Sequence, residues 1–256
     1  MKLSFLVAAS LWRRDVVRFV RQKSRVVGGL LTPIVFWLLI GFGIGESFRP
    51  PGWARPVTYA EYFFPGTLLL IVLFTAVFST VSVIEDRREG FLQGVLISPA
   101  PTAAIVAAKV AGGATLAFGH GLVFLLLAPL SGLKLTAAGL VQTLVFLALA
   151  SVLMTLLGLL VAWPMESTQG FHAVMNLFLI PLWLLSGALF PPDGAAVSVR
   201  VAMRLNPVHY LYLGLQRGLL PDGSTIAEWH LGLVSLAAIA GLAIVVTWIA
   251  ERGRSR

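Results

Sequence analysis

The sequence predicts an all-α polytopic membrane protein with six transmembrane helices, and three observations lead to this fold class. Six stretches of at least twenty residues contain no Asp, Glu, Lys or Arg, and each is long enough to cross the ~30 Å hydrocarbon core as a helix. The 256 residues are 58% hydrophobic and only 12% charged. With a mean hydropathy of +0.90, this is not a composition that a water-soluble domain carries on its surface.

The basic residues are distributed unequally between the two sides of the membrane. If the N-terminus is inside, 13 of the 19 Lys and Arg residues lie on the cytoplasmic side and 6 on the outer side. The positive-inside rule then places both termini in the cytoplasm of a multi-pass protein of the inner or plasma membrane. The net charge of +8 marks one membrane face and is not accompanied by a base-stacking aromatic platform, which excludes nucleic acid as the expected partner.

Residues 1–25 are expected to form an N-terminal amphipathic interfacial helix that is retained. Its apolar residues recur at helical spacing, and four arginines follow at steps of three and four: Arg14, Arg18, Arg21 and Arg25. Such a helix lies along the inner leaflet, where anionic headgroups of the membrane lipid attract it. The alternative is that these arginines only fix the topology.

The chain is expected to form a single transmembrane permease domain, 1–256. Its predicted spans are 26–45, 63–84, 102–130, 137–163, 171–190 and 230–250. Gly41 and Gly45 close the first span with the GxxxG spacing that lets helices approach closely in lipid. They are predicted to lie at a helix contact, either within one subunit or at a dimer seam.

Two connections are longer than the topology requires. Residues 85–98 form a cytoplasmic elbow that opens with the densest charge cluster of the chain and ends before Pro99 and Pro101, which interrupt the next uncharged run. Residues 193–220 contain two short amphipathic helices on the outer side. These are expected to be re-entrant helices before the last span or, alternatively, interfacial helices that have only a packing role.

Several motifs together resemble the transmembrane permease subunit of ABC type-2 exporters. They are Tyr62-Phe63-Phe64-Pro65-Gly66, then Glu85-Asp86-Arg87-Arg88-Glu89-Gly90 and Leu96-Ile97-Ser98-Pro99, then Leu185-Ser186-Gly187-Ala188-Leu189-Phe190-Pro191 and Asn206-Pro207-Val208-His209-Tyr210. The motifs follow one another along the chain in the same order as in that family, and together they cover nearly the whole chain. One departure is Phe91-Leu92-Gln93, where many members continue with a Thr and a Glu.

The resemblance implies a permease that forms the substrate pathway as a homodimer or as a heterodimer with a related permease. It also implies a separate cytoplasmic ABC ATPase subunit, with ATP and Mg on that partner, which pushes on the elbow. The residues it assigns to this coupling are Glu85, Asp86, Arg87, Arg88, Glu89 and Gly90.

The residues themselves limit the energy source. The chain has no G-x-x-x-x-G-K-[ST] loop to cradle nucleotide phosphates, and no Asp, Glu, Lys or Arg lies in the middle of a predicted span. We therefore expect no enzyme, no catalytic residue, no metal and no cofactor in this chain. His120 is interpreted as a hydrogen-bonded packing residue in the third span. The alternative function is a passive membrane channel or scaffold without an ATPase partner.

Overall fold

The computed structural model describes residues 2–44, 48, 56–220 and 228–254. Every regular element in these ranges is helical, and six segments of them are long and apolar enough to cross a membrane. These segments are Lys23–Ile44, Tyr59–Arg88, Thr102–Leu125, Ala137–Ala162, Thr168–Ala188 and His230–Gly253. The predicted fold class, an all-α polytopic membrane protein, is confirmed.

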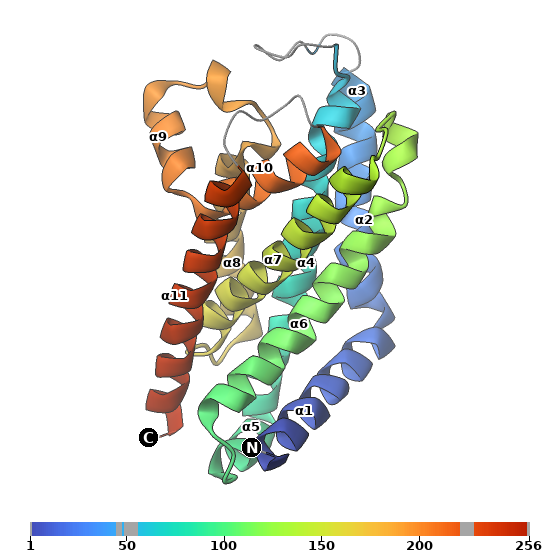
Figure 1. The fold of residues 1–256 in the computed structure, drawn as a ribbon. Helices are drawn as coiled ribbons and strands as arrows, with labels where there is room; N and C mark the ends of the chain where they lie inside the picture. The colour runs from blue at the N-terminus through green and yellow to red at the C-terminus, as the bar shows by residue number, and fades with distance from the viewer. Residues whose placement is uncertain (1, 45–47, 49–55, 221–227, 255–256) are drawn as a thin grey trace.

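Helix α4 (Tyr59–Arg88) runs through the middle of the bundle (Figure 1) and is the most buried of the six spans. It begins four residues before the predicted span because Glu61 belongs to its first turn. There Thr58 and Glu61 form a capping box, in which the Thr58 backbone N–H donates to Glu61 Oε2 at 2.9 Å. At the other end Gly90 adopts a φ of +76°, a left-handed conformation that ends the helix and turns the chain.

Four other spans pack against α4, and the last lies further out. The first consists of α2 (Lys23–Phe36), a π-helical turn (Trp37–Gly41) and α3 (Phe42–Ile44). The next three are α6 (Thr102–Leu125), α7 (Ala137–Ala162) and α8 (Thr168–Trp183), and α8 continues into a π-helical turn (Leu184–Ala188). The last is α11 (Glu228–Arg254), which lies at the edge of the bundle (Figure 1).

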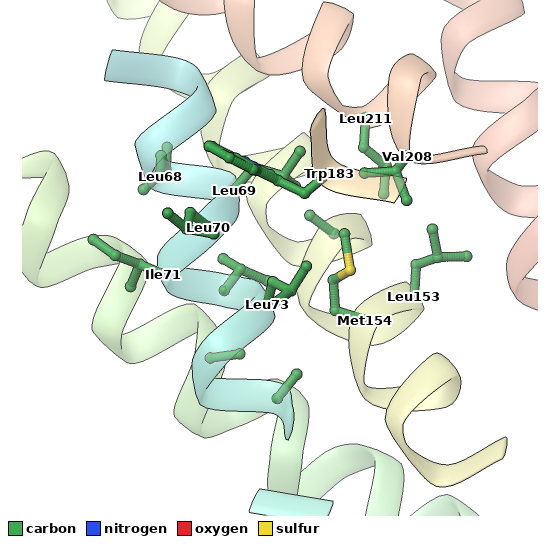
Figure 2. Close-up of a cluster of buried hydrophobic side chains, with 14 of the residues drawn as sticks. Leu68, Leu69, Leu70, Ile71, Leu73, Leu153, Met154, Trp183, Val208 and Leu211 are labelled. Carbon is green, nitrogen blue, oxygen red and sulfur yellow. The ribbon is translucent and has the colours of Figure 1, made fainter. Parts of the chain in front are cut away.

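The core lies where α4, α7, α8 and α10 (Pro207–Leu219) meet. Figure 2 shows this cluster, to which α4 contributes a run of buried residues from Leu68 to Leu73, α7 contributes Leu153 and Met154, and α8 contributes Trp183. Burial of these side chains against one another fixes the arrangement of the helices, because dispersion contacts act in lipid as they do in water.

The short helices lie at the two ends of the bundle. Helices α1 (Lys2–Arg21) and α5 (Phe91–Ile97) reach the end at which α11 finishes, and α9 (Val197–Leu205) and α10 lie at the opposite end (Figure 1). The two outer helices differ in burial. Helix α9 exposes its apolar face of Val197, Val201 and Leu205, whereas α10 buries Val208, Leu211 and Leu215 completely. Only α10 is part of the core.

The predicted contact at Gly41 and Gly45 falls partly outside the described residues, because Gly45 is not among them. Gly41 lies against the start of α4, where a Cβ on it would be 3.3 Å from the Cα of Ala60. The neighbouring Trp37 is buried there and donates its indole N–H to the Ala60 carbonyl at 3.0 Å. Gly41 therefore sits at a close contact between two spans of the same chain.

Candidate functional site

An ion-pair network joins the C-terminal end of α4 to α1 and α6, and Asp86 lies at its centre. The side chain of Asp86 is fully buried. Its carboxylate accepts hydrogen bonds from Arg14 at 2.6 and 3.0 Å, from Arg18 at 2.8 Å and from Lys109 Nζ at 2.6 Å. A buried carboxylate is tolerated only with charged partners of this kind. Asp86 therefore holds three helices together.

Lys109 is the buried cation of this network. Its side chain is 3% exposed, and its Nζ lies 2.8 Å from Asp15 Oδ2 as well as 2.6 Å from Asp86 Oδ2. Asp15 also accepts a hydrogen bond from Arg14 at 3.1 Å. The hydrogen bond to Asp86 raises the pKa of Arg14, so this guanidinium stays charged. Lys109 belongs to the third turn of α6, near the start of that span.

Glu85 and Glu89 form the rim of the network. Arg18 Nη2 lies 3.2 Å from Glu85 Oε2 and 3.0 Å from Glu89 Oε1, and Arg25 also pairs with Glu85. We call the whole set the ionic cluster; it contains four anions and four cations, namely Asp15, Glu85, Asp86, Glu89, Arg14, Arg18, Arg25 and Lys109. Its formal charge is zero, and this balance offsets the cost of burying Asp15, Asp86 and Lys109 at its centre.

Arg87 connects the end of α4 to a further element. Its guanidinium donates to the backbone carbonyl of Met165 at 2.9 Å and to that of Trp163, both in the connection between α7 and α8. The structure thus divides the six residues that were assigned to coupling. Glu85, Asp86, Arg87 and Glu89 contact other elements of this chain, and Arg88, Glu89 and Gly90 lie at the surface.

Sequence reasoning missed the pairing within the ionic cluster. It placed the arginines of residues 1–25 on a polar stripe and the acidic residues on the elbow, and it gave no role to Asp15 or Lys109. One signal was available: a lysine inside a predicted span, such as Lys109 in 102–130, needs an anionic partner.

A second polar arrangement lies at the opposite end of α4, where α8 breaks. The π-helical turn Leu184–Ala188 contains Gly187 at a φ of +99°, a conformation that favours glycine. A break of this kind leaves backbone carbonyls without helical partners, and at membrane depth such groups must be satisfied by the protein. Side chains from two other helices donate to them.

The first donors come from α4. The hydroxyl of Tyr62 donates to the Gly187 carbonyl at 2.7 Å, and the hydroxyl of Tyr59 donates to the Leu189 carbonyl at 2.8 Å. Both tyrosine side chains are buried. The two tyrosines lie one turn apart on one face of α4, so α4 supplies donors to carbonyls at the break and just after it.

The other donors come from the start of α10. The Asn206 amide donates to the Leu182 carbonyl at 2.6 Å, and its side-chain oxygen accepts from the Val208 N–H at 3.0 Å, which caps α10. His209 Nδ1 lies 2.6 Å from the Ser186 carbonyl. Burial lowers the pKa of His209, so a neutral ring that donates through Nδ1 fits this contact. We call the carbonyls of residues 182–189 and their four side-chain donors the capped break.

Gly66 allows α4 to approach the capped break closely. A Cβ at Gly66 would lie 2.7 Å from the Cβ of Ala188 and 2.8 Å from its carbonyl oxygen, so no larger residue fits without a backbone shift. Trp183 donates its indole N–H to the Gly66 carbonyl at 2.8 Å. The motifs at 62–66, 185–191 and 206–210, which are far apart in the sequence, therefore meet at one place.

The remaining polar groups have simpler surroundings. His120 Nδ1 lies 2.8 Å from the Thr75 hydroxyl and packs beside Gly29 and Phe19. Among the described residues, no group of three or more His, Asp or Glu residues is arranged to hold a metal ion. The chemistry of this structure is therefore that of ion pairs and carbonyl caps between helices.

Comparison with known proteins identifies the family. A family model described as ABC-2 type transporter matches residues 8–220. The inner membrane transport permease YadH of Escherichia coli K12 is 26% identical over 99% of this chain and 98% of its own length. Nodulation protein J of Rhizobium leguminosarum bv. trifolii is 27% identical over 78% of this chain and 76% of its own length. With its six apolar spans, this chain belongs to the membrane proteins of the ABC-2 type transporter family.

Proposed function

We propose that this chain is the permease subunit of an ATP-driven exporter and that it works as a dimer with a separate cytoplasmic ATPase, which binds ATP and Mg²⁺. One observation carries the proposal. Three consecutive residues at the end of α4 contact four other parts of the chain: Glu85 pairs with α1 and α2, Asp86 with α1 and α6, and Arg87 with the connection between α7 and α8. A force on this end of α4 would therefore reach most of the bundle.

Helix α5 is the element on which such a force acts. It follows Gly90 directly and exposes Ile97, at 84%, together with Phe91, Gln93 and Gly94. Phe91 also contacts α1, because the Arg14 guanidinium lies 3.8 Å above its ring. We infer that the ATPase docks on α5 and on the neighbouring surface residues Arg88 and Glu89, and that the ionic cluster passes the movement to α1 and α6.

Reversing the charges of Glu85 and Glu89 would not test this surface cleanly, since both pair with Arg18 of α1 and Glu85 also pairs with Arg25 of α2. Ile97→Lys is the sharper variant, because Ile97 is exposed and only docking should be lost. Leu205→Lys is its matched control, a large apolar residue that is 80% exposed at the opposite end.

Each variant would be coexpressed with the ATPase that copurifies with the parent chain, and both complex recovery and substrate export would be measured. We expect Ile97→Lys to lose both while remaining inserted, and Leu205→Lys to keep both. Normal export by Ile97→Lys would refute docking on α5. A parent chain that binds no ATPase and still conducts its substrate would favour the passive channel or scaffold.

The orientation follows from the same proposal, with α5 and both chain ends in the cytoplasm. The chain has no cysteine, so single cysteines report accessibility without background. Lys134→Cys should react with an impermeant thiol reagent in intact cells, whereas Ser98→Cys should react only after the membrane is opened. The reverse pattern would invert the topology.

A further inference from the structure

We propose that the outward face of α1 is a binding site for anionic phospholipid headgroups, with Arg13 and Arg21 as the residues that hold them. This goes beyond the transport role proposed above and does not depend on it. The first evidence is the division of the α1 arginines. Arg14 and Arg18 are committed to the ionic cluster, whereas Arg13 and Arg21 are exposed. In the part of the chain that the structure describes, neither has a carboxylate within ion-pair distance.

The two arginines lie on one stripe of the helix with apolar residues between them. Arg13, Val17 and Arg21 follow at steps of four, which places them on the same face. Val17 and the adjacent Val20 are 41% and 58% exposed, so the surface along this stripe is open. Because eight residues of helix span about 12 Å, Arg13 and Arg21 would each bind a separate headgroup phosphate.

The alternation of cationic and apolar side chains indicates where this face lies. Exposed valines are unfavourable in water and favourable at the boundary of the acyl chains, while guanidinium groups bind phosphate at the level of the headgroups. The exposed apolar surface continues from α1 into the first span through Val27 and Leu31, at 53% and 54% exposure. An acidic protein surface would also suit the arginines, but it would have to cover valines that adjoin a lipid-facing helix. Lipid is the occupant that satisfies both groups.

The test uses the purified full-length protein in lipid nanodiscs and measures how strongly it selects spin-labelled phosphatidylglycerol over spin-labelled phosphatidylcholine. The parent should prefer phosphatidylglycerol, and the preference should weaken as salt is raised. Arg13→Gln with Arg21→Gln should lower the preference for phosphatidylglycerol by about fivefold for each arginine. This factor corresponds to the ~1 kcal/mol that one basic residue contributes at an anionic surface. Arg13→Lys with Arg21→Lys should keep most of it, since the charge remains.

Lys134→Gln is the matched control, because it removes an exposed basic residue at the opposite end of the bundle. It should leave the preference unchanged. The proposal is overturned if the parent does not prefer phosphatidylglycerol, or if the glutamine double variant keeps that preference. It is equally overturned if Lys134→Gln lowers the preference as much as the double variant does. It is also overturned if the glutamine double variant loses its ATPase while its lipid preference is unchanged, because the face would then bind protein. If the glutamine double variant does not fold, the test uses the parent and the lysine double variant. A phosphatidylglycerol preference that does not weaken with salt, or that the lysine double variant loses, then overturns the proposal.

Discussion

The two ends of α4 are fixed to the rest of the bundle by opposite kinds of polar contact. At one end, the ionic cluster joins charged side chains to charged side chains around the buried Asp86. At the other end, the capped break joins neutral side chains such as Tyr62 and His209 to backbone carbonyls. The first arrangement depends on charge balance and the second on shape, because a carbonyl accepts only from a donor at the right distance and angle.

Because of this difference, we expect the two ends of α4 to have different roles. An ionic cluster with an exposed rim can be biased by a partner that brings charge or force, since part of it remains accessible: Glu89 is 57% exposed. The capped break lies among buried residues, where a Cβ added at Gly66 would clash with Ala188. We therefore expect the first region to respond to charge substitutions and the second to changes in volume or in a single hydrogen-bond donor.

The largest effect is expected from Asp86→Asn. Loss of this charge leaves Lys109 and two arginines around a neutral amide, and breaking a buried ion pair in this way costs about 3–5 kcal/mol. The free energy of unfolding would be measured in detergent micelles. Asp86→Leu with Lys109→Met should be less damaging, because it leaves three cations and three anions in the cluster. Equal losses in the two variants would mean that charge balance does not stabilise this end.

A somewhat smaller effect is expected from Gly66→Ala at the capped break. The new Cβ would meet the Cβ and the carbonyl oxygen of Ala188 at 2.7 and 2.8 Å, and overpacking of this kind costs about 1–3 kcal/mol. Gly119→Ala is the control, since a Cβ at Gly119 in α6 has no neighbour within 4 Å. It should be neutral or slightly stabilising, because alanine favours a helix. Thermal unfolding of both variants would show whether they move in opposite directions.

Tyr62→Phe isolates a single donor without changing the volume of the core. It leaves the buried Gly187 carbonyl without its 2.7 Å hydrogen bond, at a cost of about 1–3 kcal/mol. Tyr210→Phe removes a comparable hydroxyl that donates to the Arg204 carbonyl at 2.9 Å in an exposed position, where water replaces it. A comparison of the two midpoints in denaturant would show whether burial of the carbonyl decides the effect. Equal shifts would contradict the assignment of the capped break.

The smallest effect is expected from Glu89→Gln at the rim of the ionic cluster. Its ion pair with Arg18 is 3.0 Å long but largely solvated, and exposed pairs contribute about 0–1 kcal/mol. A loss of stability as large as that of Asp86→Asn would show that the cluster acts as one unit rather than as a buried centre with a weak rim. The measurement is the same unfolding experiment, repeated at low and high salt.

Much of the fold was predictable from the sequence, because the length of an uncharged stretch is a local property. Each of the six predicted spans overlaps a helical segment long and apolar enough to cross a membrane, but the bounds differ: α4 begins earlier, to include Glu61, and α6 ends at Leu125. The end of the elbow before Pro99 and Pro101 was also predictable, since α5 ends at Ile97 and α6 begins at Thr102. The two outer helices were not separable from sequence, since both are amphipathic and only packing shows that α10 enters the core while α9 does not.

The sequence by itself determined that this protein spans a membrane six times, that its elbow is the most charged segment, and that its motifs are those of the ABC-2 family. Only the tertiary structure decided what each charge does. Arg13 and Arg14 are neighbours in the chain, yet Arg14 binds Asp86, 72 positions away, and Arg13 faces outward. The physical reason is that hydrophobicity acts over a whole segment, whereas an ion pair or a capped carbonyl requires two atoms within about 3 Å. That distance is set by how helices remote in sequence pack together.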